Sequence, residues 1–375
     1  MDYAFPIIEA DELAYVIKAL ENRVCASGKI VAEFERLFAE YEGVKHAIGV
    51  SNGTDAIFLT MRALNVRGKK VAVPAMTFFA TVEAVINAGG IPVFVDIDDT
   101  YTIDPEDLAS KEFDVVMPVH LFGITANMDE ISRIAEEKGA IVVEDAAQAQ
   151  GSERRGKKVG SIGKAGAFSF YPTKNLYTCG RAGAITTNDD ELAEKIRLLR
   201  AHGEKSKYYH VLVGRNMRMS DPEAAILKEQ MKKLDERVEI RRRNAKILIE
   251  ELSGVEGVTL PPEEPPHAKR SRHLFPIRVE KPEEFVEKLN RLGIPARRIY
   301  QVPIHKMEVM QRINDPDVNM RAGFIEYPDY SKVVLKKTEE LSEKTVVLPV
   351  HHGLTEEDMK IIVEGVKRVL KRNFS

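Results

Sequence analysis

The sequence has no tryptophan and only two cysteines among its 375 residues. Cys25 and Cys179 are isolated in the chain, so we expect neither a disulfide framework nor a cysteine-based zinc site. No uninterrupted apolar run approaches the roughly 18 residues that a membrane-spanning helix needs. No basic segment followed by an apolar one comes after Met1, so a secretory signal is not expected either.

A dominant charge of one sign is also missing. Lys and Arg total 55 against 58 Asp and Glu, which gives a net charge of −3, and the two signs are interspersed. This balance disfavours a nucleic-acid-binding surface and an acidic tail. What remains is a globular protein, expected in the cytoplasm, whose length and 44% apolar residues suffice for two domains or one large one.

Short apolar runs alternate with helical stretches between about Val44 and Asn188. Repeated strand–helix–strand units of this kind favour an α/β fold with a mostly parallel sheet and helices on both faces. The runs that predict buried strands are 46–50, 71–74, 93–96, 115–119 and 141–144.

A different pattern begins near residue 222. It predicts a long helix over 222–252, with Asp221 as its N-cap and three arginines, 241–243, on a solvated face. Four apolar residues at helical spacing predict a seam that faces the core: Leu227, Met231, Leu234 and Val238.

A proline-rich loop at 261–266 interrupts the regular pattern. The elements predicted beyond it are strands at 273–279 and 346–350 and helices at 282–292 and from residue 356. We therefore predict a large domain over residues 1–245, which includes an N-terminal arm, and a smaller C-terminal α+β domain over residues 246–375.

Three segments of the α/β part could carry chemistry. The residues 51–56 lie where a strand turns into a helix, and the free N–H groups of such a helix start bind phosphate, although an ordinary cap explains them too. Asp145 ends a strand, where ligands bind in open α/β sheets, or it caps the next helix. Lys174 lies in a run of otherwise apolar or small residues, and a lysine in a site that excludes water forms Schiff bases readily. Alternatively, Lys174 is an ordinary surface lysine.

Together these groups match what pyridoxal phosphate requires for its phosphate, its pyridinium nitrogen and its aldehyde. Over nearly its whole length the chain then resembles the DegT/StrS-type sugar aminotransferases, which use this cofactor on the aspartate-aminotransferase fold. The resemblance implies fold type I of the pyridoxal-phosphate-dependent transferases, with a seven-stranded-type sheet. The motifs that carry it occur in order: Ser51–Ala56, Pro74–Phe78, Val119–Gly123, Glu144–Ala149, Pro172–Leu176, Arg200–Gly203, Asn216–Met219, Pro303–His305 and Leu348–His351.

The resemblance implies a role for each matching residue. Lys174 would hold the cofactor as an internal aldimine and then move the proton, while Asp145 would keep the pyridinium nitrogen protonated. The residues implied to bind the cofactor are Gly53, Thr54, Phe78, Asp145, Gln148, Ser169, Lys174 and Asn216. Two further residues are implied to contact the substrates: Arg218 and His305. No metal is implied.

Some of these roles have a simple alternative. Phe78 would stack on the cofactor ring or lie in the core, and Gln148 would reach the ring hydroxyl. Asn216 would complete the phosphate site from the neighbouring subunit, so the active unit would be a homodimer or a larger homo-oligomer. Arg218 could instead form a salt bridge on the dimer face, and His305 could be an ordinary loop histidine.

The implied reaction moves an amino group from an amino acid, expected to be L-glutamate, to a keto group of a nucleotide-linked hexose, by way of pyridoxamine phosphate. It would belong to amino-sugar biosynthesis for a polysaccharide or lipopolysaccharide. The segment 177–183 lacks the family's usual acidic, glycine-rich pattern, which leaves the acceptor sugar open.

Three other functions remain as alternatives. A pyridoxamine-phosphate-dependent sugar dehydratase of the same fold would carry histidine in place of Lys174. A non-catalytic regulator that kept the fold would have lost Lys174 or Asp145. A nicotinamide-dependent oxidoreductase would show a Gly-x-Gly-x-x-Gly fingerprint, and the glycine-spaced segment 160–166 does not match it.

Overall fold

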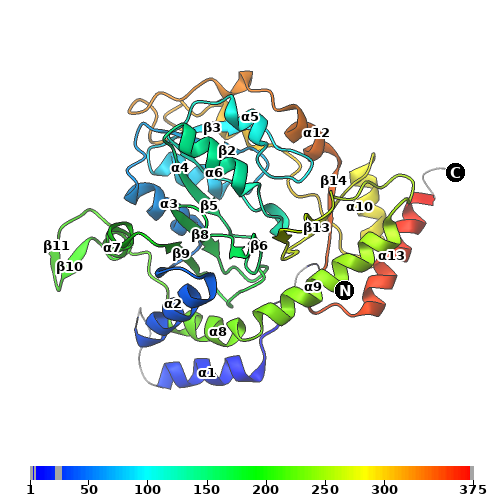
Figure 1. Ribbon diagram of the computed structural model, residues 1–375, viewed down its shortest axis with the longest axis horizontal. Helices are drawn as coiled ribbons and strands as arrows, with labels where there is room; N and C mark the ends of the chain where they lie inside the picture. Colours follow the sequence, from blue (N-terminus) through cyan, green and yellow to red (C-terminus); the bar gives the residue numbers. More distant parts are fainter. Residues whose placement is uncertain (1–2, 4–5, 22–27, 372–375) are drawn as a thin grey trace.

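A seven-stranded sheet forms the centre of the larger part of the molecule (Figure 1), with the strand order β1-β9-β8-β5-β4-β2-β3. Within this sheet β9 runs antiparallel to both of its neighbours and the other pairs are parallel, as predicted. The strands are β1 (His46–Val50), β2 (Lys70–Pro74), β3 (Ile91–Val95), β4 (Val115–Val116), β5 (Ile141–Asp145), β8 (Ala165–Ser169) and β9 (Gly183–Thr187). The computed structural model describes residues 3, 6–21 and 28–371, so Met1, Asp2 and Cys25 lie outside it.

Helices cover both faces of this sheet because alternate residues of its strands point to opposite sides. Side chains such as Ile48 and Val73 pack on α3, α4 and α7, whereas Ala47 and Phe168 pack on α2 and α8 and Val116 packs on α6. The bounds of these helices are α2 (Lys29–Glu42), α3 (Gly53–Ala63), α4 (Ala80–Asn87), α6 (Met128–Glu137), α7 (Asp190–Leu199) and α8 (Asp221–Met231).

The C-terminal part has a hydrophobic core of its own. The antiparallel strands β13 (Phe275–Arg278) and β14 (Thr345–Leu348) pack with α9 (Leu234–Leu252), α10 (Pro282–Arg291) and α13 (Glu356–Lys371). Ala245, at the predicted domain boundary, lies inside α9 and is the first residue to join this core. The division at 245/246 stays a prediction, because the intervening segment between β13 and β14 sends Ile304 and Met310 into the core of the larger part.

The prediction of one long helix over 222–252 is wrong in one respect, because the chain forms two helices, α8 and α9, with a break between them. The N–H groups of Lys232 and Lys233 bond to carbonyls three residues back, at Glu229 and Gln230, and this tighter turn ends α8. The predicted core-facing seam is still present, since Leu227, Leu234 and Val238 are buried and Met231 packs against them.

Two details of these helices also differ from expectation. Ser220, not Asp221, caps α8, in a capping box with Glu223. Asp221 is buried and accepts hydrogen bonds from the N–H groups at the start of α2 instead. Arg241 was expected on a solvated face, but it is 3% exposed and donates to the carbonyl of His273 at 3.3 Å.

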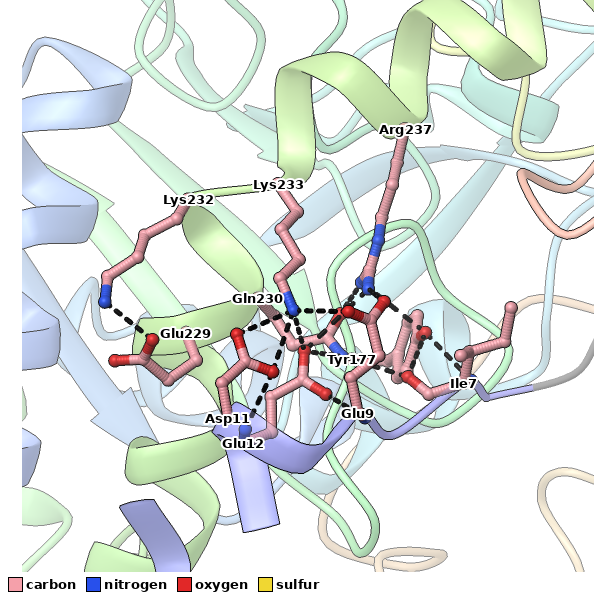
Figure 2. Close-up of polar contacts among 10 residues, drawn as sticks. All are labelled: Ile7, Glu9, Asp11, Glu12, Tyr177, Glu229, Gln230, Lys232, Lys233 and Arg237. Atoms are coloured by element: carbon pink, nitrogen blue, oxygen red, sulfur yellow. Dashed lines mark hydrogen bonds and ion pairs between the residues drawn. The ribbon is translucent and has the colours of Figure 1, made fainter. Parts of the chain in front are cut away.

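The N-terminal arm is fastened to the segment that follows Lys174 (Figure 2). The Tyr177 hydroxyl accepts a hydrogen bond from Ile7 N at 3.0 Å and donates one to the Ile7 carbonyl at 2.9 Å. Farther along the arm, Glu9 accepts from Lys233 Nζ at 2.8 Å and from Arg237 at 3.0 Å. The helix α1 (Ala10–Glu21) then lies along α8.

The remaining elements are short or peripheral. They are α5 (Pro105–Ala109), η1 (Leu121–Gly123), β6 (Glu153–Arg154), β7 (Lys157–Lys158), β10 (Glu204–Ser206), β11 (Tyr209–His210), β12 (Ala268–Lys269), η2 (Ile304–Lys306), α11 (Glu308–Gln311), η3 (Tyr330–Lys332) and α12 (Lys336–Lys344). The hairpin of β10 and β11 projects from the body beside α7 (Figure 1). No helix in the described part of the chain is long and apolar enough to cross a membrane.

Glu42, at the end of α2, should destabilise the fold at neutral and alkaline pH. It is 3% exposed, and neither of its carboxylate oxygens has a hydrogen-bond partner among the described residues. Burial therefore raises the pKa of Glu42 well above its ordinary value. A folded state that holds this proton more tightly than the unfolded state loses stability as the pH rises above the ordinary glutamate pKa.

We expect Glu42→Gln to gain stability relative to wild type between pH 5 and pH 8, by about 1 kcal/mol or more, since one pKa unit corresponds to about 1.4 kcal/mol. Urea unfolding of both proteins at the two pH values measures this. Glu256→Gln, at an exposed position, is the control and should show no such change. Equal differences at both pH values would contradict the interpretation.

Candidate active site

Four loops meet at the edge of the sheet where its parallel strands end. They follow β1, β2, β5 and β8, and each contains one of the motifs singled out in the sequence. Val50 and Ser169 both pair with Gly183, the first residue of β9, which brings the ends of β1 and β8 level. Asp145, the last residue of β5, pairs with Ala167 on the adjoining strand. Ligands bind at this edge of open α/β sheets.

The start of α3 lies directly against the end of β8. A Cβ atom on Gly53 would lie 2.7 Å from the Cβ of Ser169, which is too close, so glycine is required there. Asn52 caps the helix by accepting a hydrogen bond from Asp55 N at 2.8 Å. The next N–H groups, of Gly53 and Thr54, belong to a first turn that has no intrahelical acceptors, and the helix dipole favours an anion there. The structure thus brings Gly53, Thr54 and Ser169 together.

Asp145 is a buried carboxylate that accepts hydrogen bonds from neutral donors. Its Oδ2 accepts from Thr81 Oγ1 at 2.9 Å and its Oδ1 from Ala147 N at 3.1 Å, while the residue is only 4% exposed. Burial raises the pKa of Asp145, and these two hydrogen bonds and the charge of Lys174 act in the opposite direction. A cation that also donates a hydrogen bond would stabilise this carboxylate.

The adjacent residue, Glu144, is in a very different position. It points to the other side of β5 and accepts from the N–H groups of Gly160, Ile162 and Gly163 at 2.7–2.8 Å. His120 Nε2 lies 3.0 Å from the same carboxylate. Glu144 is therefore fully partnered and fixes the 160–163 segment, which leaves Asp145 as the carboxylate that faces the site.

Lys174 lies in a turn after β8, where its N–H donates to the carbonyl of Tyr171 at 2.8 Å. Asn175 secures this turn by donating to the carbonyls of Gln150 and Ser271, each at 3.3 Å. Burial lowers the pKa of Lys174 to about 8, and the charge of Asp145 opposes this shift. A minor fraction of the amine is therefore neutral, and nucleophilic, near pH 7, and this fraction exceeds that of an ordinary lysine.

Gln148 and Phe78 lie beside this pair. Gln148 Oε1 accepts from Phe122 N at 2.9 Å, and its Nε2 donates to the Tyr300 hydroxyl at 3.3 Å. The Phe78 ring is 61% exposed, which excludes the core position that was its alternative. Its centroid lies 6.4 Å from that of the Tyr300 ring. Both residues are thus available to a ligand at the sheet edge, and their roles toward a cofactor stay predictions.

Asn216 and Arg218 are exposed on the strand-like segment that follows the β10–β11 hairpin. Arg218 Nε donates to Asn216 Oδ1 at 3.0 Å, and Arg218 forms a bridge with Val50 at the end of β1. This segment therefore passes close to the start of α3. The contact of Asn216 with a phosphate bound to the neighbouring subunit stays a prediction.

His305 is less accessible than its predicted substrate role requires. It is fully buried in η2, its Nε2 lies 3.1 Å from Glu339 Oε1, and its ring packs at 5.9 Å from that of Phe94. Burial lowers the pKa of His305, while Glu339 acts in the opposite direction. A contact with substrate would need this pair to open, and the substrate role of His305 stays a prediction.

Three residues at the site were not anticipated from the sequence. Thr81, in the first turn of α4, holds Asp145, and Thr77 lies 2.8 Å from its hydroxyl. Tyr300 contacts Gln148 from the C-terminal part of the chain. His273 is buried near Lys174, and burial, followed by the charges of Lys174 and Arg241, keeps its pKa well below the ordinary value. The Pro303–His305 motif lay three residues from Tyr300 and was the only available signal for it.

These residues fit pyridoxal 5′-phosphate. The start of α3, packed closely against Ser169, offers N–H groups to a phosphate. Asp145 is a buried carboxylate suited to a protonated ring nitrogen. Lys174 supplies an amine that is partly neutral. The three groups that the cofactor requires therefore lie at one edge of the sheet.

Comparison with known proteins agrees with this arrangement. The family model for the DegT/DnrJ/EryC1/StrS aminotransferase family matches residues 6–367. A pleiotropic regulatory protein of Geobacillus stearothermophilus is 39% identical over 347 residues, covering 90% of this chain and 89% of the relative. A dTDP-3-amino-3,6-dideoxy-alpha-D-galactopyranose transaminase of Aneurinibacillus thermoaerophilus is 36% identical over 362 residues, 94% of each chain. The crystal structure of S. venezuelae DesV with a ketimine intermediate superposes with a TM-score of 0.88 at 31% identity, over 98% of each chain.

We expect Lys174 to react with pyridoxal 5′-phosphate in a pH-dependent way. With its pKa lowered to about 8, the rate of attachment to cofactor-free protein should rise roughly tenfold per pH unit below 8 and level off above it, since the neutral amine is the nucleophile. Borohydride reduction and peptide mapping across this range measure the rate, with exposed Lys332 as the internal control. A rate that parallels that of Lys332 up to pH 10 would contradict the lowered pKa.

Proposed function

Because this chain belongs to the DegT/DnrJ/EryC1/StrS aminotransferase family, we propose that it moves an amino group from L-glutamate to a keto group of a nucleotide-linked hexose. The chain is a pyridoxal-phosphate-dependent sugar aminotransferase by family and fold. The observation that carries the proposal is the position of a partly neutral Lys174 and a buried Asp145 beside the glycine-lined start of α3.

Different residues of the chain have different roles in this reaction. Bound pyridoxal 5′-phosphate supplies an electron sink that makes the α-proton of an amino acid acidic. Asp145, buried and held by Thr81, stabilises a proton on the ring nitrogen. Lys174 Nζ is neutral often enough near pH 8 to take the proton from the donor's α-carbon. Phe78 and Tyr300 lie beside the site with their ring centroids 6.4 Å apart, where a ligand could contact both rings.

These observations disfavour two of the alternative functions, the sugar dehydratase and the non-catalytic regulator. A dehydratase of this fold must not bind its cofactor covalently, and Lys174 is present where such a relative would carry histidine. A purely regulatory protein would not need a lysine whose pKa is lowered or a carboxylate buried beside it. The regulatory name of the Geobacillus relative nevertheless makes a direct test of chemistry the first requirement.

The proposed substrates follow from the relatives. A transaminase of a dTDP-linked 3-amino sugar shares 36% of its sequence with this chain, and this favours a nucleotide-linked keto-hexose as acceptor. We place the reaction in amino-sugar supply for a surface polysaccharide or lipopolysaccharide. A cytoplasmic location stays a prediction.

We also propose that two copies of the chain share each active site. The β10–β11 hairpin projects from the body (Figure 1), and the segment around it exposes apolar side chains that a second copy could cover: Tyr208, Tyr209, Val211, Leu212 and Val213. Asn216, which follows directly, would then reach the neighbouring phosphate site.

We expect purified wild-type protein with bound cofactor to lose its visible absorbance on addition of L-glutamate and to release 2-oxoglutarate. Lys174→Ala should do neither, and Asp145→Asn should slow this half-reaction by about a hundredfold or more, because the ring nitrogen loses its partner. Stopped-flow absorbance and a 2-oxoglutarate assay measure both effects. Cofactor binding without any response to an amino donor would instead favour the regulator.

Mixed dimers test the sharing of the site. Lys174→Ala and Asn216→Ala protomers should each be nearly inactive alone. If Asn216 acts across the interface, a refolded equal mixture should regain about one quarter of wild-type activity, since half of the dimers would carry one intact site. An inactive mixture, with dimers of both types shown by mass spectrometry, would place Asn216 in the same subunit as Lys174.

A further inference from the structure

We propose that Tyr300 is a positioning residue for the active site, which acts by fixing the side-chain amide of Gln148 against the cofactor ring. No motif assigned a role to Tyr300, and it reaches the site from the C-terminal part of the chain. The inference rests on the proposed use of pyridoxal 5′-phosphate, and its test is designed to separate the two.

The orientation of Gln148 is set by two contacts of opposite kind. Phe122 N–H is a donor, so the amide atom that it contacts at 2.9 Å must be the oxygen, Oε1. The nitrogen, Nε2, then faces the other way and donates to the Tyr300 hydroxyl at 3.3 Å. An amide nitrogen has two hydrogens, so the second one remains for a ligand. Gln148 is 7% exposed, which leaves its amide few other positions.

Tyr300 is itself held by the fold. It packs with Ile299 against a buried cluster that includes Phe122, the residue that fixes the other end of the Gln148 amide. Tyr3 of the N-terminal arm belongs to the same cluster, and Arg297 lies 4.4 Å from the centre of its ring. The Tyr300 ring also faces Phe78 at 6.4 Å. The hydroxyl is therefore placed by packing on several sides and does not rely on Gln148.

The chemistry of the phenol suits this role. Burial and the charge of Asp145 both raise the pKa of Tyr300, so the hydroxyl stays neutral and keeps a constant dipole while other groups at the site change protonation. A neutral oxygen can accept from Gln148 Nε2 throughout. The amide is thus kept in one orientation, and the hydrogen that it offers to a ring oxygen keeps its direction.

The test is a double-mutant cycle on the full-length protein with Tyr300→Phe, Gln148→Ala and the double variant. Two quantities are measured: the affinity of cofactor-free protein for pyridoxal 5′-phosphate, and the midpoint of the pH titration of visible absorbance. We expect Tyr300→Phe to lower the affinity about five- to tenfold. It should move the midpoint to higher pH, because a weaker donor makes the ring oxygen more basic.

If Tyr300 acts through Gln148, the double variant should match Gln148→Ala alone in both measurements. Tyr101→Phe is the matched control, because it removes another buried tyrosine hydroxyl from the same cluster and should behave as wild type. Tyr300→Phe that behaves like Tyr101→Phe, or that adds fully to Gln148→Ala, would overturn the inference. Wild-type protein that binds no cofactor would overturn the proposed function, and this inference with it.

Discussion

The active site depends on one carboxylate that is buried among neutral donors. Among the described residues, Asp145 accepts hydrogen bonds from a threonine hydroxyl and a backbone N–H, and burial is the largest influence on its pKa, which it raises. The surrounding arrangement follows from the need to satisfy this group. Thr77 and Thr81 form a short chain of hydroxyls beside it, and the charge of Lys174 lowers its pKa.

The pair Glu144 and Asp145 shows how a strand separates structural from chemical function. Successive residues of β5 point to opposite sides of the strand. On one side, the Glu144 carboxylate accepts hydrogen bonds from three backbone N–H groups and lies beside His120 Nε2. That carboxylate is saturated and rigid. Its neighbour is left under-partnered, and the same main chain therefore carries one group that maintains the fold and one that can respond to a ligand.

Much of this could be predicted from the sequence because the determining signals are local. Strands that are buried on both faces are continuous apolar runs, and recognisable motifs at or just after their ends hold Gly53, Asp145 and Lys174. The break between α8 and α9 escaped prediction, because both halves favour helix and the turn at Lys232 and Lys233 serves tertiary packing. The burial of Arg241 escaped prediction for a related reason, because charge in a sequence does not reveal whether tertiary neighbours bury a side chain.

Tyr300 could not be predicted, because its partner Gln148 lies 152 residues earlier in the chain. The contact of Tyr177 with Ile7 spans 170 residues. Contacts between such distant positions close long stretches of chain, and the entropy of that closure must be offset by packing elsewhere. The strands and the helix start are made from neighbouring parts of the sequence, whereas the arm and the Gln148 amide are fixed by distant ones. The site is therefore complete only when both ends of the chain lie against the sheet.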